Sequence, residues 1–316
     1  MATLQRFIAS LLIFLIALTA PMYAWDDLGH MTVAYVAYQH LNAPTKTRVD
    51  QLLKLNSDYS KWKAMVPSGT TAAKTKMMIF MMAATWPDAI KSEPGYSDDG
   101  SENGDRPDGI TSSQNIGYSD HLHHKYWHFI DMPFSTDGTS LPSLPSPNAE
   151  TQIAAFRSVL ASNDPDGKKS YDLVWLEHLV GDVHQPLHAA TRVSSVDPQG
   201  DHGGNLVKLC TSPCKKELHA FWDQILGTGA VPTAAITVGR ALPAAEPALA
   251  AKKDASDWVN ESFEAAKQTV YTAPIGSGDG PFTVTAAYRV KAKQVARQRI
   301  ALAGVRLANL LNTELK

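Results

Sequence analysis

Apolar residues along the chain recur mostly at the spacing of an α-helix. Seven segments have apolar residues at i, i+3 and i+4 or consist of good helix formers: residues 30–41, 44–56, 70–85, 148–161, 170–184, 254–271 and 284–312. The pattern breaks in residues 92–120, which are rich in Gly, Ser and Asp, and in residues 133–147, which are rich in Pro and Ser. Both stretches are predicted loops.

Strand material is short in this sequence. It runs from Asn205 to Cys210, and a return strand is expected after the turn CTSPC. The sequence has no visible internal repeat and no Gly-rich phosphate loop after a strand. The pattern therefore predicts one mainly α-helical domain with a short β-hairpin.

Residues 1–24 have a composition of their own. They carry one early charge, Arg6, then an apolar run from about Ile8 to Ala20 and a small residue at Ala24. This order is typical of a secretory signal peptide. An uncleaved membrane anchor is the alternative, but the run is short for a bilayer span of about 20 residues. We expect a mature domain of residues 25–316, beginning at Trp25, in a secreted or periplasmic location.

An oxidising compartment changes the interpretation of the two cysteines. Cys210 and Cys214 lie in the polar stretch CTSPC and can form a small loop disulfide there. A metal site is the other reading, but two Cys alone make a poor one.

Composition and charge limit the function. With 44% hydrophobic and 19% charged residues, the 316-residue chain can bury a full core, which excludes a disordered or fibrous protein. Lys and Arg number 29 against 31 Asp and Glu, for a net charge of −2. This balance argues against a broad basic surface for nucleic acid, so any affinity for phosphate must be local. The 11 His are the compositional excess.

The strongest candidate motif is LEHLVGDVHQPLH. It places His178 and Asp182 four residues apart on one helical face, where both can coordinate the same ion. Pro186 is expected to end the helix and to direct His188 elsewhere. A surface helix with scattered His is the plain alternative, but the apolar neighbours predict a core-facing helix, where unpaired polar groups are costly.

Other fragments repeat this chemistry. ELHAFWD places His219 and Asp223 four residues apart, WPD contains Asp88, and KYWHFID contains His128 and Asp131. Taken alone, Asp88 is more typical of a helix end, and His128 of a histidine within an aromatic cluster.

The start of the mature chain offers a further ligand set. In WDDLGH, a free α-amino group and the carbonyl of Trp25 can chelate a divalent ion, and His30 can complete the grip. An ordinary apolar N-terminus is the plain alternative.

Taken in order, these motifs resemble one family. WxxxxH, WPD, WHFID, HLVGDVHQPLH, GDHGGN and LHAFWD, followed by the terminal AYRVKAKQVARQRIALAGVRLANLLN, are similar to the zinc-dependent single-strand-specific nucleases of the S1/P1 type, the type I nucleases. The resemblance spans essentially the whole mature chain, and the two Cys favour a bacterial member. It implies the helical fold that these nucleases share with zinc-dependent phospholipase C.

The resemblance implies a site of three zinc ions. Asp88, His128 and His178 would hold the first, with Asp182 shared between it and another ion. His188, His219 and Asp223 would hold a second, and Trp25, His30 and Asp182 the third. Nitrogen and carboxylate ligands suit zinc better than calcium or magnesium, which prefer oxygen.

The family's activity is hydrolysis of single-stranded DNA and RNA to 5′-phosphorylated products, with 3′-nucleotidase activity on 3′-mononucleotides. The resemblance implies attack on phosphorus by zinc-bound hydroxide, with Asp131 orienting the attacking water. An unpaired base would enter a side pocket that Gly203, Gly204 and Asn205 help to build. A tight turn leading into a strand is the plain reading of that motif. We expect a monomer.

Two alternatives remain at this point. Zinc-dependent phospholipase C shares the fold and an N-terminal Trp, but its last helical ligand pair is typically His and Glu, where this chain has His219 and Asp223. A secreted zinc-binding protein without turnover is the other. The remaining histidines have no ligand position in the family and are expected on the surface, in loops or in the core, although HLHH could bind adventitious metal: His40, His121, His123, His124, His184 and His202.

Overall fold

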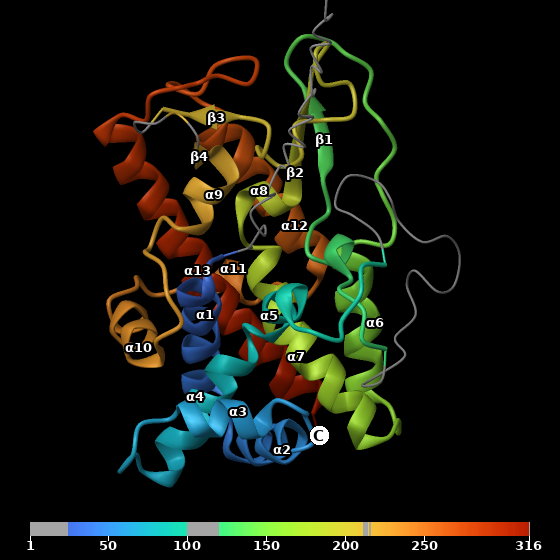
Figure 1. The fold of residues 1–316 in the computed structure, drawn as a ribbon, viewed down its shortest axis with the longest axis vertical. Helices are drawn as coiled ribbons and strands as arrows, with labels where there is room; N and C mark the ends of the chain where they lie inside the picture. The colour runs from blue at the N-terminus through green and yellow to red at the C-terminus, as the bar shows by residue number, and fades with distance from the viewer. Residues whose placement is uncertain (1–24, 100–119, 211–213, 215, 316) are drawn as a thin grey trace, which may run out of the picture.

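A computed structural model describes residues 25–99, 120–210, 214 and 216–315. Within them the chain is mainly helical, which confirms the predicted fold class (Figure 1). The helices of the first half are α1 (Asp27–His40), α2 (Ala43–Leu53), α3 (Tyr59–Met65), α4 (Ala72–Ala83), α5 (Trp86–Ala89), α6 (Ala149–Ala161), α7 (Asp166–Asp182) and α8 (Pro186–Ala189). Those of the second half are α9 (Leu218–Asp223), α10 (Pro232–Arg240), α11 (Pro247–Ala250), α12 (Ala255–Ala265) and α13 (Ala286–Glu314).

Short helical turns add to these elements. They are the 3₁₀ turns η1 (Ile90–Ser92) and η3 (Lys125–Trp127) and the π-helical turn η4 (Ala266–Val270), which continues α12. Among the helices of the described residues, none is both long and apolar enough to cross a membrane. The proposed signal peptide, residues 1–24, and most of the predicted loop 92–120 lie outside the described residues.

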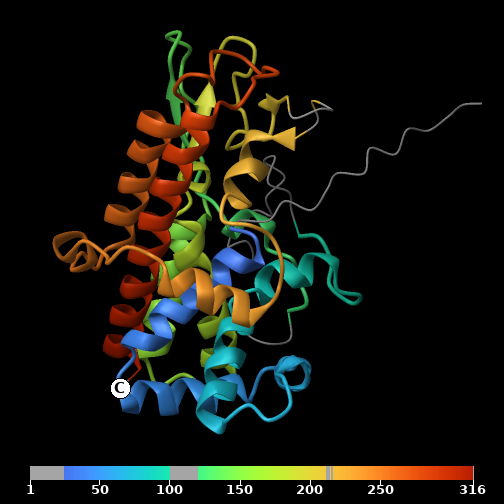
Figure 2. The same cartoon turned by 90° about the vertical axis from the view of Figure 1, so that its left-hand side faces the viewer.

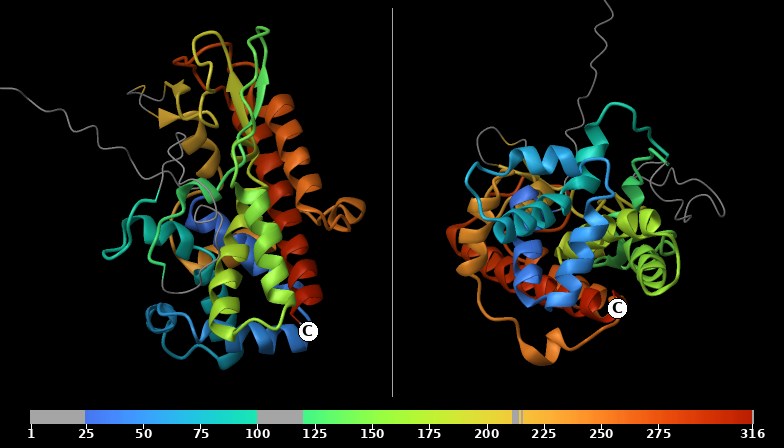
Figure 3. Two further views of the ribbon diagram at one scale, coloured as in Figure 1. Left: turned by 90° about the vertical axis from the view of Figure 1, so that its right-hand side faces the viewer. Right: turned by 90° about the horizontal axis from the view of Figure 1, so that it is seen from below.

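Helix α7 lies at the centre of the molecule. Every residue from Lys169 to Asp182 is buried, and the helix packs against α6, α2, α13 and α1 (Figure 3). Figure 2 shows α12 and α13 running side by side along one edge. Because α7 is covered on all sides, its polar residues must find partners inside the protein.

Local sequence explains where several helices begin and end. Asn148 forms a capping box with Thr151, which starts α6, and Thr285 caps α13 by accepting the N–H of Tyr288. Helix α7 ends at Asp182, and Pro186 opens the short helix α8 in a new direction. The predicted break before His188 is therefore confirmed.

Two small sheets complete the fold. Strand β3 (Lys208–Leu209) pairs antiparallel with β4 (Lys216–Glu217), as predicted, and a disulfide joins Cys210 and Cys214 in the connection. Strand β1 (Met132–Ser135) pairs in parallel with β2 (Ala190–Val193). The prediction of a loop over 133–147 was therefore wrong for its first three residues. A four-residue strand that contains Pro133 gives no alternation, and only its distant partner makes it a strand.

The seven predicted helices are confirmed, with shifts at their ends. The apolar pattern missed α3, α10 and four helices of four to six residues, α5, α8, α9 and α11, although the spacing of His219 and Asp223 implied a helical turn at α9. A helix of four residues is barely longer than one turn, so it shows no recurring apolar face.

A buried ionic network joins the last two long helices to the core. Glu261 of α12 accepts from Arg306 Nη1 at 2.8 Å and from Arg299 Nη1 at 3.0 Å, and both arginines are buried on α13. Burial raises the pKa of the Glu261 carboxyl, but the hydrogen bonds from Arg306 and Arg299 outweigh burial and bring it to about 2. The carboxylate therefore stabilises the folded state.

We predict that Glu261→Gln lowers the free energy of unfolding by about 3 kcal/mol, because two buried guanidinium groups lose their counter-charge. Urea unfolding at pH 7 measures the change. The difference from wild type is present above the unfolded pKa of a glutamate and shrinks as pH falls toward 2. Glu264→Gln, in the same helix but in an exposed pair with Lys267, is the control and should leave stability nearly unchanged. Equal stability of Glu261→Gln and Glu264→Gln would contradict the argument.

Candidate metal centre

Eight acidic and histidine side chains from five helices and one loop meet in the core. They form three groups in which the candidate ligand atoms lie within 4.8 Å of one another: His30, Asp88 and His178; His128, His178 and Asp182; and His188, His219 and Asp223. Each of the eight is buried. The structure therefore brings together every side chain that the sequence predicts as a zinc ligand.

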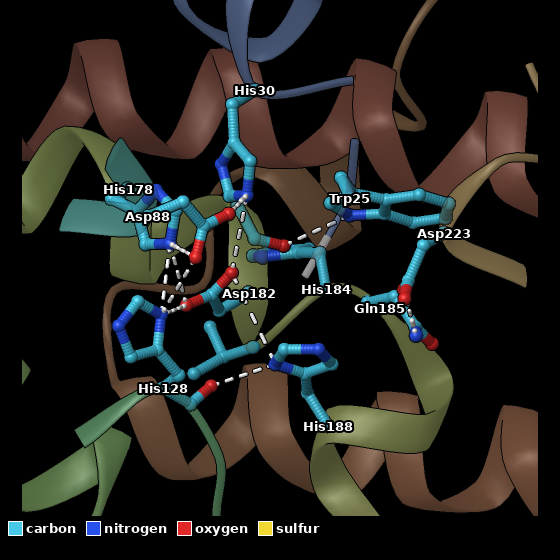
Figure 4. Close-up of polar contacts among 12 residues, drawn as sticks. Trp25, His30, Asp88, His128, His178, Asp182, His184, Gln185, His188 and Asp223 are labelled. Carbon is cyan, nitrogen blue, oxygen red and sulfur yellow. Dashed lines mark hydrogen bonds and ion pairs between the residues drawn. The ribbon is translucent and has the colours of Figure 1, made fainter. Parts of the chain in front are cut away.

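Asp182, at the last residue of α7, lies between the histidines. Its Oδ2 is 3.1 Å from His128 Nδ1 and 3.3 Å from His178 Nε2. Its Oδ1 is 3.4 Å from His30 Nε2 and 4.0 Å from His188 Nδ1. Figure 4 shows these side chains pointing toward the carboxylate from different elements. One carboxylate thus faces all three groups, which suits a ligand shared between ions.

Asp88 completes the first group from the short helix α5. Its Oδ2 is 4.0 Å from His30 Nε2, and its Oδ1 is 3.7 Å from His178 Nε2 and 3.8 Å from His128 Nδ1. Distances of this size are too long for hydrogen bonds but leave room for an ion between the atoms. Because WPDA forms a helix of one turn, Asp88 is held rigidly against α7.

The third group sits at α8 and α9. His219 Nε2 is 3.1 Å from His188 Nε2 and 3.5 Å from Asp223 Oδ2. The i, i+4 spacing places His219 and Asp223 on one face of α9, as predicted. Gln185 donates its Nε2–H to Asp223 Oδ1 at 2.8 Å and so leaves Oδ2 facing His219.

Main-chain carbonyls set the orientation of three imidazoles. Their Nδ1–H groups donate to carbonyl oxygens at 2.7 or 2.8 Å: His178 to Ala84, His188 to His128 and His219 to Gly203. Each Nε2 of a neutral ring then carries a lone pair toward its group. The lone pairs of His188 and His219 consequently face each other, an arrangement that a cation between them would stabilise.

Burial shifts the pKa values of several of these groups in a direction that favours metal binding. It lowers the pKa of His30, His128 and His188 well below the usual range, which keeps these imidazoles neutral. It raises the pKa of Asp182 to about 6 and that of Asp223 well above its ordinary value. Buried carboxylates without a cation are costly, so the site favours a positive ion.

Buried polar atoms without hydrogen-bond partners also favour a bound cation. Among the described residues, no hydrogen-bond partner is found for either ring nitrogen of His30, for Asp88 Oδ2, for His128 Nε2 or for Asp182 Oδ1. Buried polar atoms normally have partners. A donor set of imidazole nitrogens and carboxylate oxygens fits zinc.

Trp25 lies beside these groups and is fully buried. Its indole N–H donates to the carbonyl of Gly181 at 3.0 Å, and the N–H of Asp26 donates to the carbonyl of Asp223 at 3.2 Å. A Cβ at Gly181 would lie 2.9 Å from His30 Nδ1, so glycine is needed for α1 to approach α7. The backbone at Trp25 is therefore fixed next to the candidate ligands.

Lys91 is a site residue that the sequence prediction missed. Its Nζ is 2.7 Å from Asp88 Oδ1, and its side chain is 8% exposed. The i, i+3 spacing from Asp88 on a continuing helical turn is a signal that was available in WPDAIK. A partly buried cation at the edge of the acidic group can meet an anion.

Asp131 follows the candidate ligand His128 by three residues but is not in the three groups. It has φ of 56°, a left-handed conformation that Asp tolerates better than most residues. The neighbouring Ile130 N–H donates to the carbonyl of His188 at 2.8 Å, which anchors this segment to α8. Asp131 is partly exposed. Backbone strain of this kind often marks functional positions.

The GDHGGN loop supports the third group. Gly203 has φ of 59°, and a Cβ there would lie 2.5 Å from the carbonyl oxygen of Leu187, so glycine is required for the contact with His219. Asn205 donates Nδ2–H to the carbonyl of His202 at 2.6 Å, and its side chain is partly exposed. The turn that the plain reading expects is present, with Gly204 at φ of 81°.

The histidines without a predicted ligand position do not join the groups. His184 is buried and accepts from Arg306 Nη1 at 2.9 Å. His123 and His124 of HLHH are paired with carboxylates, and His40 is exposed.

Comparison with known proteins agrees with this geometry. The model of the family described as S1/P1 nuclease matches residues 25–316. Endonuclease 3 of Arabidopsis thaliana is 26% identical over 98% of this chain and 95% of its own length. Nuclease S1 of Aspergillus oryzae is 24% identical over 66% of this chain and 56% of its own length. Because the family model covers nearly the whole chain, this protein belongs to the S1/P1 nuclease family.

Proposed function

We propose that this nuclease is a zinc-dependent endonuclease that hydrolyses single-stranded DNA and RNA to 5′-phosphorylated products and also acts on 3′-mononucleotides. The observation that carries the proposal is the meeting of eight buried His and Asp side chains in three groups, in a member of a nuclease family. Signal cleavage after Ala24 would give a secreted or periplasmic monomer of residues 25–316.

Three zinc ions are the proposed cofactors. Asp88, His128 and His178 would hold one, and His188, His219 and Asp223 another. The third would take His30 with the amine and carbonyl of Trp25, and Asp182 would be shared. Zinc bound in this way supplies Lewis acidity and lowers the pKa of water to about 7.

The residues around the centre can capture phosphate locally. Lys91 offers a cation at the edge of the Asp88 group, in a protein of net charge −2. A short-range positive site inside a nearly neutral surface binds one phosphate rather than a long duplex. A positive site of this size supports a substrate strand that enters the centre one nucleotide at a time.

Asp131 is the proposed residue that orients the attacking water. Its partly exposed carboxylate follows His128 by three residues, and its segment is tied to His188 through Ile130. Such a carboxylate can accept a proton from the attacking water and orient the lone pair of that water toward phosphorus. The alternative role is a carboxylate that only supports a ligand.

Single-strand preference follows from access. A phosphate whose base stays stacked in a duplex cannot reach a recessed centre, whereas an unpaired base can turn into a side pocket. Gly203, Gly204 and Asn205 are proposed to line that pocket, because the carbonyl of Gly203 already holds His219. Asn205 keeps a carboxamide oxygen and a second N–H for a base edge.

Phospholipase C activity is the competing function. The candidate ligand pair of α9 is His219 and Asp223, where that enzyme typically has His and Glu, and the family model is that of a nuclease. A protein that binds zinc without turnover is the second competitor.

We predict that the mature protein cleaves single-stranded DNA, RNA and 3′-AMP, does not cleave lecithin, and loses these activities in a chelator. Gel and phosphate-release assays measure this. Metal analysis should give about three zinc ions per chain. Cleavage of lecithin without cleavage of nucleic acid would overturn the nuclease proposal, and a count near one would overturn the trinuclear site. Bound zinc without turnover on any substrate would support the non-catalytic alternative.

Asp131→Asn is expected to retain zinc and lose turnover on the order of 10²-fold, because Asn keeps the left-handed backbone but cannot take a proton. Steady-state kinetics and metal analysis on the same preparation measure both quantities. Asp257→Asn, on the exposed face of α12, is the control. Normal turnover would remove the proposed role, and loss of zinc would assign Asp131 to ligand support instead.

Asp182→Asn is expected to stabilise the metal-free protein at pH 7 by about 2 kcal/mol. Burial raises the pKa of this carboxyl to about 6, so the ionised form costs stability above that pH, and the cost disappears below the unfolded value near 3.8. The same variant should lose the rise in melting temperature that zinc produces in wild type. Urea unfolding in chelator and thermal unfolding with zinc measure the two effects. A variant that still gained stability from zinc as wild type does would contradict the shared-ligand role.

A further inference from the structure

His124 lies in a second buried cluster, away from the three ligand groups. Its Nδ1 is 2.6 Å from Asp99 Oδ2 and its Nε2 is 2.5 Å from Asp120 Oδ2. The imidazole is 1% exposed, and the carboxylates are 8% and 1% exposed. Asp99 and Asp120 stand on either side of residues 100–119, so this one ring joins two segments that are distant along the chain.

The geometry fits a proton on both ring nitrogens. An ionised carboxylate only accepts hydrogen bonds, and a neutral imidazole has one N–H to donate. With a carboxylate oxygen at hydrogen-bond distance from each nitrogen, His124 fits as an imidazolium between two anions.

The neighbours of His124 hold the carboxylates in place. Tyr126 donates its hydroxyl to Asp99 Oδ2 at 2.7 Å, and Tyr171 of α7 donates its hydroxyl to Asp120 Oδ2 at 2.9 Å. The backbone N–H of His124 donates to Asp99 Oδ1 at 2.8 Å. The other charged groups beside this cluster pair with each other further out: His123 and Lys125 both contact Asp98, whose side chain is 62% exposed.

The ring of His124 also contacts the segment that carries a proposed ligand. It stacks on Trp127 with centroids 3.6 Å apart and planes 4° from parallel. Trp127 is fully buried and packs edge-on against Trp175 of α7 at 4.9 Å. His128 follows Trp127 directly, and its own ring lies 5.5 Å from that of Trp175.

Backbone strain shows that this position is imposed by the cluster. His124 has φ of 47°, a left-handed conformation that is uncommon for histidine and immediately precedes η3. Residues in such conformations persist where surrounding contacts over-determine them. The two carboxylates and the Trp127 stack provide those contacts.

We propose that His124, held as an imidazolium between Asp99 and Asp120, is a positioning residue that fixes Trp127 and thereby the metal ligand His128. It acts through Trp127 and touches none of the three ligand groups. The predicted effect on zinc binding rests on the proposed metal centre. The protonation state of His124 and its ordering of residues 125–130 do not depend on that centre.

The proposal gives a direction for pH. Burial lowers the pKa of His124, but the hydrogen bonds that its ring donates to Asp120 and Asp99 outweigh burial and raise it above 6.5. Burial raises the pKa of Asp99, but His124 outweighs burial and lowers it. The contribution of His124 is complete below pH 6.5 and is lost as pH rises through its folded pKa. That of Asp99 is complete above its ordinary value and is lost as pH falls.

The test compares His124→Gln with His123→Gln, its neighbour, which pairs with one exposed carboxylate. Imidazole ¹⁵N NMR of the full mature chain should show a doubly protonated ring at pH 7 whose signal is absent from His124→Gln and present in His123→Gln. Amide exchange in residues 125–130 should be on the order of tenfold faster in His124→Gln alone. A singly protonated His124 at pH 7, or unchanged exchange, would overturn the proposal.

Zinc affinity gives the functional readout. Competition with a chelator should show about tenfold weaker zinc binding in His124→Gln, and His123→Gln should bind as wild type does. The ratio of wild type to His124→Gln should fall toward one as pH rises through the His124 pKa, which a uniform loss of stability would not produce. A constant ratio would overturn the pH argument.

Two further outcomes are distinguishable. If wild type binds no zinc, the proposed function fails, while the NMR and exchange measurements still decide the state and hold of His124. If His124→Gln does not fold, Asp99→Asn removes one of the two charged contacts and should give an intermediate change in exchange. An Asp99→Asn protein with wild-type exchange and zinc affinity would overturn the proposal.

Discussion

The burial of charged and polar side chains on α7 is the constraint on which the rest of the structure depends. This helix has no exposed face over its last fourteen residues, yet it ends in Asp182 and carries His178 one turn earlier. A carboxylate in such a place must be neutralised or paired. The imidazoles of His30, His128 and His188, from α1, the η3 segment and α8, converge on it. The packing of these elements on α7 and the assembly of the candidate centre are therefore one event.

Neutral imidazoles alone do not neutralise the buried carboxylate of Asp182. Burial lowers the pKa of His30, His128 and His188 and keeps these imidazoles neutral. The Nε2 atoms of His188 and His219 face each other at 3.1 Å. The groups that orient these rings are main-chain carbonyls, which cannot shift without moving whole segments. Such a site is rigid and electron-rich before any cation arrives, which lowers the reorganisation needed on binding.

What the sequence could predict followed helical periodicity. The pairs His178 with Asp182 and His219 with Asp223 are local, because an i, i+4 spacing on a helix sets their geometry without knowledge of the fold. The order of six short motifs then indicated the family, and the long amphipathic segments indicated a helical fold. The antiparallel hairpin was predictable because a short turn joins its strands.

The features that the sequence did not predict depend on contacts between distant segments. The parallel pairing of β1 with β2 joins residues 58 positions apart, as in Met132 with Ala190, and neither strand is distinctive alone. His124 in HLHH has Asp120 four residues before it, but its second partner, Asp99, lies 25 residues earlier and becomes a neighbour only after folding. Short helical elements such as α5 and η1, which carry Asp88 and Lys91, leave no recurring apolar face.

The parallel pair has a consequence for the spacing within the centre. His128 and His188 each precede one strand of the pair, and their segments are joined by two hydrogen bonds: the ring of His188 donates to the His128 carbonyl, and the N–H of Ile130 donates to the His188 carbonyl. The spacing of the backbone at His128 and His188 is thus fixed largely by the pairing of the two strands. The loops beyond Ser135 and Val193 can therefore differ in length or sequence without changing the spacing of these two histidine segments.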